Sequence, residues 1–354
     1  MNYKILFLII LIFFIACSTN NNSQITTIKI EEENYNNSID LDNYMDSIFY
    51  LSVAKNVPMI TGINKILFTK NSIIIEEQSI FSNKPVFSID FSGLLKNTYG
   101  SVGKGPNEYI SAFDIALNTD NKSLFIYDRN KKSLLEYNTE NGLFVNSISI
   151  PFYMLQLIFK DNNYVATYAD EEGDNEFILF NIKTGIKEFG LYTYNELYEI
   201  EIPKVFAQDS NKTYFLRPAS DTVFEIENNK LIPSIRINYG KNSVGNKFRE
   251  IPGFELKNKY LQQMYLALTT EIYASENLLL FNYLKNNELR SFMLDDKNKI
   301  LFHGKDFVYK NVVLPKPITL WKKFLVFFII PEIYKIDEMP DNENFVLMFI
   351  RIKS

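Results

Sequence analysis

The sequence has few of the residues on which enzymes and metal sites most often depend. Its 354 residues include one cysteine (Cys17), one histidine (His303) and one tryptophan (Trp321), with only 13 glycines and 12 prolines. A lone cysteine cannot form an intrachain disulfide, and a zinc site needs several Cys or His ligands. The net charge is −5 at pH 7, whereas sequence-independent nucleic-acid binding needs a basic surface. We therefore expect no metal site, no cofactor and no nucleic-acid partner.

Aromatic residues are abundant instead, with 30 Phe and 22 Tyr. Aromatic and β-branched side chains favour strands. We interpret this enrichment as a bias of the whole chain toward strand-forming residues. A carbohydrate-stacking surface is the alternative.

The amino terminus has the pattern of an export signal. Lys4 is followed by eleven unbroken apolar residues, Ile5 to Ile15, and then by Ala16 and Cys17. Eleven residues are too few for a membrane-spanning helix, which needs about 20, but they suit the roughly 7–15 residues of a signal-peptide core. A small residue before a cysteine is where lipoprotein signal peptidase cuts, although Phe14 replaces the usual Leu.

These features predict a lipoprotein signal peptide at residues 1–16 and lipidation of Cys17, the only cysteine. Residues 17–24 form a polar run typical of a flexible tether. The alternatives are a plain secretory signal with an incidental cysteine and an uncleaved anchor. No acidic run follows Ser18, which favours an anchor in the outer membrane that faces the periplasm.

The rest of the chain, residues 25–354, repeats one sequence pattern: an apolar strand, a polar turn and a second strand that ends in a turn. Closing turns at Gly93, Gly142 and Gly185 give spacings of 49 and then 43 residues. Propeller blades repeat at about 40–50 residues, and a ring of blades protects the strand edges that a single blade exposes. The six strand pairs are 72–76 with 85–93, 123–128 with 133–138, 164–168 with 177–182, 213–217 with 222–226, 278–281 with 289–294, and 324–328 with 345–350.

The pattern predicts an all-β, six-bladed propeller, with a β-sandwich as the second choice. Either Thr26–Ile30 or Ser47–Val53 is expected to pair with the C-terminal hairpin and close the ring. An insertion at about 240–270 carries helical spacing from Leu256 to Leu268, which predicts a short helix. A second insertion, 331–343, interrupts the last repeat.

The most distinctive motif is Gly103-Lys104-Gly105-Pro106-Asn107-Glu108-Tyr109. It lacks the spacing of a phosphate-binding loop and of a dinucleotide fingerprint. We interpret it as a structural turn between two blades, in which Gly103 and Gly105 supply positive φ angles and Pro106 stiffens the exit.

This motif resembles that of the six-bladed β-propeller lipoproteins of Bacteroides-type bacteria, which carry a G-x-G-P-x-E-Y turn. The resemblance extends over nearly the whole chain after the signal peptide. It implies an NHL-like propeller in the cell envelope with no established common activity. The further segments that carry it are Leu124–Asp128, Tyr137–Gly142, Ser220–Ile226 and Asp341–Leu347, in which Asn344 stands where proline is usual.

Other candidate sites are weak. The acidic run Asp170–Glu176 could bind calcium but is more typical of a solvated hairpin tip. His303 is expected to lie in a turn beside Gly304. Four residues that flank hairpin turns are expected to stabilise those turns: Asp128, Arg129, Arg217 and Asp221.

These observations favour a membrane-anchored envelope lipoprotein that acts as a binding scaffold for a protein, peptide or glycan. The alternative is a propeller enzyme, a lyase or hydrolase, with its site at the central channel. The binding hypothesis predicts no cluster of titratable residues. The enzyme hypothesis predicts two or more carboxylates with a His or Arg within hydrogen-bond reach at the channel.

Overall fold

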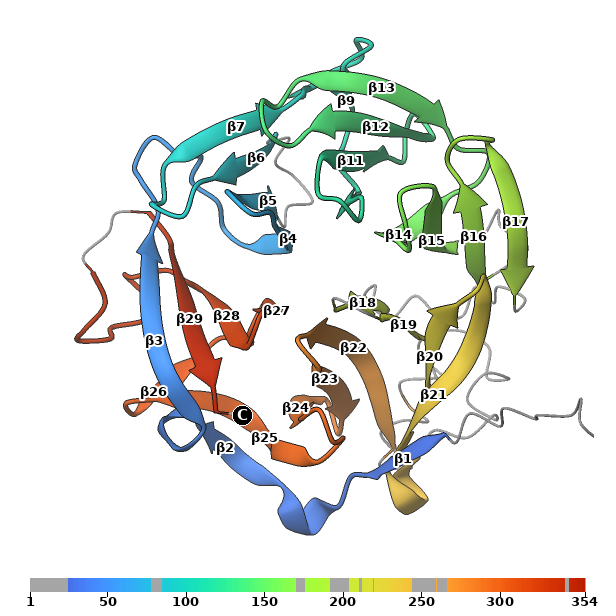
Figure 1. Cartoon of the computed structure of the whole chain (residues 1–354). Helices are drawn as coiled ribbons and strands as arrows, with labels where there is room; N and C mark the ends of the chain where they lie inside the picture. Colours follow the sequence, from blue (N-terminus) through green and yellow to red (C-terminus); the bar gives the residue numbers. More distant parts are fainter. Residues whose placement is uncertain are drawn as a thin grey trace, which may run out of the picture.

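The fold is a six-bladed β-propeller, seen here in a computed structural model (Figure 1). The structure describes residues 25–77, 85–169, 176–191, 204–209, 212–218, 220–243, 259, 266–340 and 344–353. The predicted signal peptide and tether, with Cys17, lie outside these residues. The prediction of an all-β propeller is confirmed.

Each blade is an antiparallel sheet whose first strand faces the axis. Blade 1 holds β4 (Ile63–Phe68), β5 (Ile73–Glu77), β6 (Val86–Ile89) and β7 (Leu95–Tyr99). Blade 2 holds β10 (Asp114–Leu117), β11 (Ser123–Asp128), β12 (Ser133–Asn138) and β13 (Phe144–Ser149). Blade 3 holds β14 (Met154–Phe159), β15 (Tyr164–Ala169), β16 (Phe177–Asn181) and β17 (Ile186–Leu191).

The other three blades complete the ring. Blade 4 holds β18 (Phe206–Gln208), β19 (Thr213–Leu216), β20 (Thr222–Glu227) and β21 (Lys230–Asn238). Blade 5 holds β22 (Ala267–Ser275), β23 (Leu278–Lys285), β24 (Glu288–Leu294) and β25 (Ile300–Tyr309), with β26 (Val312–Leu314) beside β25. Blade 6 holds β27 (Thr319–Trp321), β28 (Phe324–Ile329) and β29 (Val346–Ile352).

The six predicted strand pairs are the second and third strands of the six blades. These strands are buried on both faces because each blade packs against its two neighbours; β5 and β6, for example, are buried along nearly all of their length. Outer strands such as β13 are mostly exposed. The strongest apolar runs therefore come from the middle of each blade.

A segment near the amino terminus, residues 26–52, runs along the outer edge of blades 4, 5 and 6, and we call it the strap (Figure 1). Strand β1 (Thr26–Lys29) pairs in parallel with β21, and β2 (Asn36–Asp40) pairs in parallel with β25. Strand β3 (Met45–Ser52) pairs antiparallel with β29 and is the outer strand of blade 6. The second of the two proposed closing strands therefore closes the ring, whereas β1 extends blade 4.

Short elements join these sheets. Three 3-10 helices are described, η1 (Glu32–Asn34), η2 (Leu41–Asn43) and η4 (Gly240–Asn242), and β8 (Ser101–Val102) pairs with β9 (Glu108–Tyr109). The hairpin of β20 and β21 turns at Asn228 and Asn229, which both have positive φ, as a two-residue turn of this kind requires.

The two predicted insertions have different outcomes. Most of the proposed helix, from Leu256 to Met264, falls outside the described residues, and Leu268 belongs to strand β22. The second insertion connects β28 to β29, and residues 331–340 form turns there.

Candidate functional site

The glycine-rich motif is a turn that connects blade 1 to blade 2. The Glu108 carboxylate folds back over it and accepts hydrogen bonds from Gly105 N (2.7 Å) and Ser101 Oγ (3.3 Å). The Lys131 ammonium donates to the carbonyls of Gly105 (2.8 Å) and Glu108 (2.7 Å). Buried Tyr109 accepts from Val86 N (2.7 Å) and donates to a carbonyl of blade 1. These contacts join the two blades.

The expected reason for the two glycines is wrong. Gly103 and Gly105 do not have positive φ, whereas nearby Gly100 does (φ +65°). A Cβ at Gly103 would lie 2.0 Å from Glu108 Oε2, and one at Gly105 would lie 2.9 Å from it. A side chain at either position would therefore displace the Glu108 carboxylate from the place where it accepts hydrogen bonds from Gly105 N and Ser101 Oγ.

His303 does not lie in a turn, which corrects the prediction from its glycine neighbour. It belongs to β25, is 2% exposed, and its Nε2 lies 2.6 Å from the hydroxyl of Tyr283. Burial lowers its pKa to about 4, so the imidazole is neutral at pH 7. Gly304 is needed because the strap passes over it: a Cβ there would lie 2.7 Å from Asn36 O.

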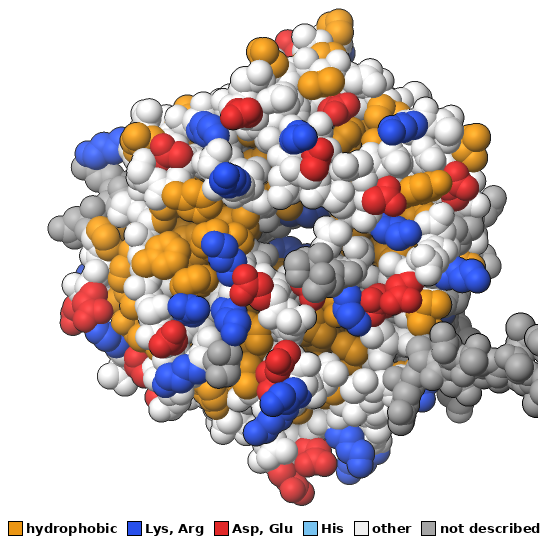
Figure 2. All heavy atoms as spheres, in the orientation of Figure 1, with side chains coloured by type: hydrophobic (Ala, Val, Ile, Leu, Met, Phe, Trp, Pro, Cys, Tyr) orange, Lys and Arg blue, Asp and Glu red, His pale blue; other side chains and the backbone are white. Residues whose placement is uncertain are grey.

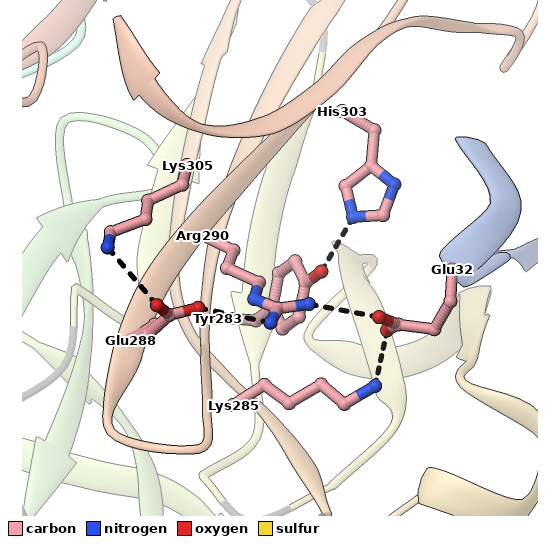
Figure 3. A network of polar contacts seen from close by, with 7 residues as sticks. All are labelled: Glu32, Tyr283, Lys285, Glu288, Arg290, His303 and Lys305. Carbon is pink, nitrogen blue, oxygen red and sulfur yellow. Dashed lines mark hydrogen bonds and ion pairs between the residues drawn. The ribbon is translucent and has the colours of Figure 1, made fainter. Parts of the chain in front are cut away.

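His303 belongs to a polar cluster between the strap and blade 5, which we call the rim network (Figure 3). The Glu32 carboxylate of the strap accepts hydrogen bonds from Lys285 and from Arg290 (3.1 Å). Glu288 accepts from Arg290 (3.1 Å) and Lys305 (3.1 Å). Burial alone would raise the pKa of Glu32, but the hydrogen bonds and charges of Lys285 and Arg290 hold it below its usual value.

Each cation of the rim network therefore has a carboxylate partner, although Lys285 and Arg290 are only 7% and 8% exposed. The guanidinium of Arg290 also lies over the ring of Tyr35, 4.0 Å from its centroid. A network with its charges paired in this way pins the strap to blade 5. Its contacts are those of a structural clamp.

A second group of charged side chains surrounds the axis, and the search for sequence motifs missed it. We call it the channel cluster: Lys65, Glu76, Asp114, Lys204 and Glu271. Lys65, Asp114 and Glu271 lie on the first strands β4, β10 and β22, while Lys204 precedes the first strand β18. Figure 2 shows Lys or Arg side chains inside the central opening.

One half of the channel cluster ties blades 1, 2 and 3 together. Lys65 Nζ lies 2.8 Å from Asp114 Oδ1 and donates to Leu157 O (3.1 Å), and Asp114 Oδ2 accepts from Leu157 N (2.7 Å). Asp114 is 4% exposed. Its charge is therefore balanced within the protein.

Glu76 lies behind this pair. It is 2% exposed and accepts a hydrogen bond from Asn64 Nδ2 (2.9 Å), while the described residues offer its Oε1 no partner. Burial, and then the charge of Asp114, raise its pKa to about 8, against the opposing effects of Lys65 and Lys204. Glu76 is therefore mostly protonated at pH 7.

The other half of the cluster lies against blades 4, 5 and 6. Lys204 Nζ donates to Ile318 O (3.3 Å). Lys316 lies farther from the axis, because its Nζ donates to Ser291 Oγ (3.2 Å) on β24 and to the Lys305 carbonyl on β25, the third and fourth strands of blade 5. Glu271 accepts hydrogen bonds from the Tyr273 hydroxyl and from Asn282 Nδ2. Burial lowers the pKa of Lys204, and it lowers that of Lys316 to about 8.

β-Bulges interrupt the first strands of blades 1, 3 and 5. They fall between Ile63 and Lys65 in β4, between Met154 and Gln156 in β14, and between Thr269 and Glu271 in β22. A bulge re-aims the side chains beside it and is common next to functional sites. The bulges in β4 and β22 directly precede Lys65 and Glu271.

An exposed aromatic patch lies where blade 6 meets blade 1. Trp321 stacks on Phe68 (4.8 Å between ring centroids) and on Phe91 (5.5 Å), and Lys322 lies over its ring. Phe91 is 38% exposed. In Figure 2, hydrophobic side chains gather on one side of the opening, over the junction of these blades. Most other aromatic rings are in the core, as the composition-bias interpretation expects.

The remaining candidates give no site. The described residues contain no group of three or more His, Cys, Asp or Glu that could hold a metal ion. Most of the possible calcium run, 170–175, lies outside them, and Glu176 pairs with Arg217 (3.0 Å). Asp128 accepts from Asn130 N and Lys131 N and stabilises its turn as predicted. No described helix is long and apolar enough to cross a membrane.

The side chains of the channel cluster match the expectation of neither the binding hypothesis nor the enzyme hypothesis. A cluster of titratable groups exists, so that prediction of the binding hypothesis is wrong. The carboxylates of the cluster interact with lysines, whereas carboxylates with a His or Arg within hydrogen-bond reach are what would have favoured the enzyme hypothesis. The channel is therefore our candidate site, and its chemistry is that of paired and unpaired lysines around an axis.

Comparison with known proteins supports the fold. A family model described as "Domain of unknown function (DUF4934)" matches residues 25–351. A solved structure from Bacteroides fragilis NCTC 9343, described as a presumed exported protein, is 15% identical, with a TM-score of 0.74 over 94% of this chain and 100% of that chain. A member of the DUF4221 family from Bacteroides vulgatus is 12% identical, with a TM-score of 0.54 over 87% of this chain and 97% of that chain. No curated protein matches the chain.

Proposed function

We propose that this chain, which belongs to the DUF4934 family, is a lipid-anchored propeller of the cell envelope that binds a ligand in its axial channel. The observation that carries the proposal is the convergence of charged side chains from blades 1, 2, 4 and 5 on the axis, where the Leu157 backbone of blade 3 and the Ile318 carbonyl beside blade 6 also make contacts. Perturbed pKa values in a concave site are typical of functional groups.

The free-energy cost of burying an unpaired ammonium group at the axis also supports a binding role. Partly burying an ammonium group without a carboxylate partner is unfavourable. The lowered pKa of Lys204 reflects that cost. A fold under selection for stability alone would place apolar side chains there, and proteins retain such costs where function needs them.

The envelope location rests on the predicted signal peptide and lipidated Cys17, together with the similarity to a protein described as exported. We expect the anchor to place the propeller at the outer membrane, facing the periplasm. Several acyl chains on one cysteine give stable anchoring where a single chain is marginal. The Cys17→Ser variant should leave the membrane fraction and lose labelling by a fatty-acid analogue, and continued labelling would rule out the lipoprotein assignment.

Ligand binding can be tested on protein purified from its own cell envelope. Native mass spectrometry should detect a small molecule bound to the wild-type chain and missing from the Lys204→Met variant. The Lys322→Met variant, altered on the exposed aromatic patch, is the matched control and should keep the molecule. A bound mass that persists in Lys204→Met would place the ligand elsewhere.

A further inference from the structure

The outer edge of blade 2 differs from the outer edges of the other blades in carrying no charge. Strand β13 is the outermost strand of its sheet and lies on the circumference of the propeller (Figure 1). Its residues, Phe144–Ser149, include no charged side chain. Among the described residues, the outermost strands β1, β2, β3, β7 and β17 each contain at least one: Lys29, Asp40, Asp46, Lys96 and Lys187.

The edge of β13 is also exposed and regular. Alternate backbone N–H and C=O groups of an edge strand point away from its neighbour, and they can pair with another strand. The residues from Asn146 to Ser149 pair with β12 in unbroken register, because the bulge lies near the start of β13. Val145 is 55% exposed, and Leu143, just before the strand, is 64% exposed. Charged side chains are a common protection of sheet edges, and this edge lacks them.

The outer edges of this propeller accept additional strands elsewhere in the molecule. The strap adds β1 to β21 at the edge of blade 4 and β2 to β25 at the edge of blade 5. Among the described residues, no strand is added in this way to blades 1, 2 and 3. Addition of a strand at the circumference is therefore compatible with the ring, and the edge of blade 2 is open to it.

The absence of charge favours a second copy of the same strand as the added partner. When two copies pair antiparallel about a twofold axis, each strand lies against its own sequence in reverse. A single charge such as Lys96 of β7 would then approach the same charge of the other copy, and like charges on paired strands are destabilising. Strand β13 has no such penalty. Its exposed Asn146, Ser147 and Ser149 can form hydrogen bonds across the pair.

From these observations we propose that two copies of this chain associate through antiparallel pairing of their β13 strands, which joins the two copies of blade 2 into one continuous sheet. This pairing does not involve the ligand proposed for the axial channel, because β13 lies on the circumference (Figure 1). Two short strands bury less than the about 1,200 Å² of a stable complex. We therefore expect weak association, with a Kd of about 10–100 µM.

Sedimentation velocity tests the pairing on the full chain with the Cys17→Ser substitution, which removes the predicted acylation site. Between about 1 µM and 1 mM, the chain should change from monomer to dimer. Adding Ser147→Lys places like charges on the two paired strands and should weaken the dimer by about tenfold or more. Thr98→Lys, at an exposed position of β7, is the matched control and should leave the Kd unchanged.

Circular dichroism shows whether each variant is folded, and Ser149→Lys, also exposed on β13, takes the place of Ser147→Lys if the latter does not fold. A chain that stays monomeric up to about 1 mM would overturn the proposal, and this is the result expected if the edge of β13 pairs only with a strand of a different protein. A dimer whose Kd is the same in the folded β13 variants and in Thr98→Lys would also overturn it, because the two copies would then meet through another surface.

Discussion

The rim network and the channel cluster use similar side chains to different ends. In the rim network Glu32 and Glu288 pair with Lys285, Arg290 and Lys305, and the result holds the strap against blade 5. In the channel cluster Lys65 pairs with Asp114, whereas Lys204 forms no ion pair among the described residues. Burial alone therefore does not mark a functional site here, and the informative difference is whether each buried charge already has a partner within the protein.

The positions of the two clusters explain this difference. The rim lies between two segments of the same chain that must stay together, so fixed ion pairs contribute to closure of the ring. The axis is where the first strands of the blades meet, and a ring of blades leaves an opening there (Figure 2). A charge left unpaired at the opening remains accessible to a ligand.

The largest expected effect comes from breaking the closure of the ring in blade 6. Truncation after Met339 removes β29, on which both β3 and β28 pair. The product should be unfolded or aggregated, because two strand edges and the apolar faces of blades 1 and 6 become exposed. Circular dichroism and gel filtration check this, with a chain that begins at Ile25 as the folded control. A soluble truncated protein that unfolds cooperatively would show that β29 is not needed to close the ring.

A smaller loss is expected when one rim ion pair is broken. Glu32→Gln leaves Lys285 buried without a carboxylate partner. Since Glu32 is itself 47% exposed, we expect a loss of about 1–3 kcal/mol in the free energy of unfolding, between the values for surface and buried pairs. Urea denaturation measures it, and the exposed neighbour Glu33→Gln should change stability by less than about 0.5 kcal/mol. Equal losses in the two variants would mean that the network does not hold the strap.

A pH-dependent effect is expected in the channel. Glu76 keeps its proton in the folded protein up to pH about 8, while its ordinary pKa is 4.5. Because the folded-state pKa is raised, wild-type stability falls as pH rises from 4.5 toward 8. Glu76→Gln lacks this loss, so its stability relative to wild type should grow over that range, reaching about 1 kcal/mol or more at pH 8.

Denaturation series at pH 4.5, 6 and 8 measure this difference, with Glu140→Gln in an exposed turn as the control. Glu76 faces Asp114, Lys65, Lys204 and Asn64, so the same series should be run on Asp114→Asn to separate burial from the charge of its neighbour. If the advantage of Glu76→Gln shrinks as pH rises, the carboxyl group is ionised in the folded protein.

The sequence predicted the middle of every blade and little of either polar cluster. The paired strands from 72–93 to 324–350 were recognisable because burial on both faces demands continuous apolar runs. The first strands were missed because they are short or interrupted: β18 and β27 have three residues each, and β4, β14 and β22 carry bulges. The charged residues inside the first strands β4, β10 and β22, namely Lys65, Asp114 and Glu271, were the signal that could have located the axis.

The strap and the residues beneath it show a second limit of prediction from the sequence alone. Strand β2 has the polar sequence Asn36-Asn37-Ser38-Ile39-Asp40, so no hydrophobic pattern announces it. His303 was assigned to a turn because Gly304 follows it. That glycine lies in a strand, and its missing side chain leaves room for the backbone of the strap. The channel residues lie about one blade apart in the chain and come together only when the ring closes, which no local pattern can encode.

The most direct test of the distinction between the rim network and the channel cluster compares Lys204→Met with Lys285→Met in urea denaturation at pH 7. Removing an unpaired, half-buried charge from the channel should leave the free energy of unfolding unchanged or raise it by about 1 kcal/mol. Removing the paired charge from the rim network should lower it by about 1–3 kcal/mol. A larger loss for Lys204→Met than for Lys285→Met would contradict the distinction, because the channel lysine would then be part of the structure rather than of a binding site.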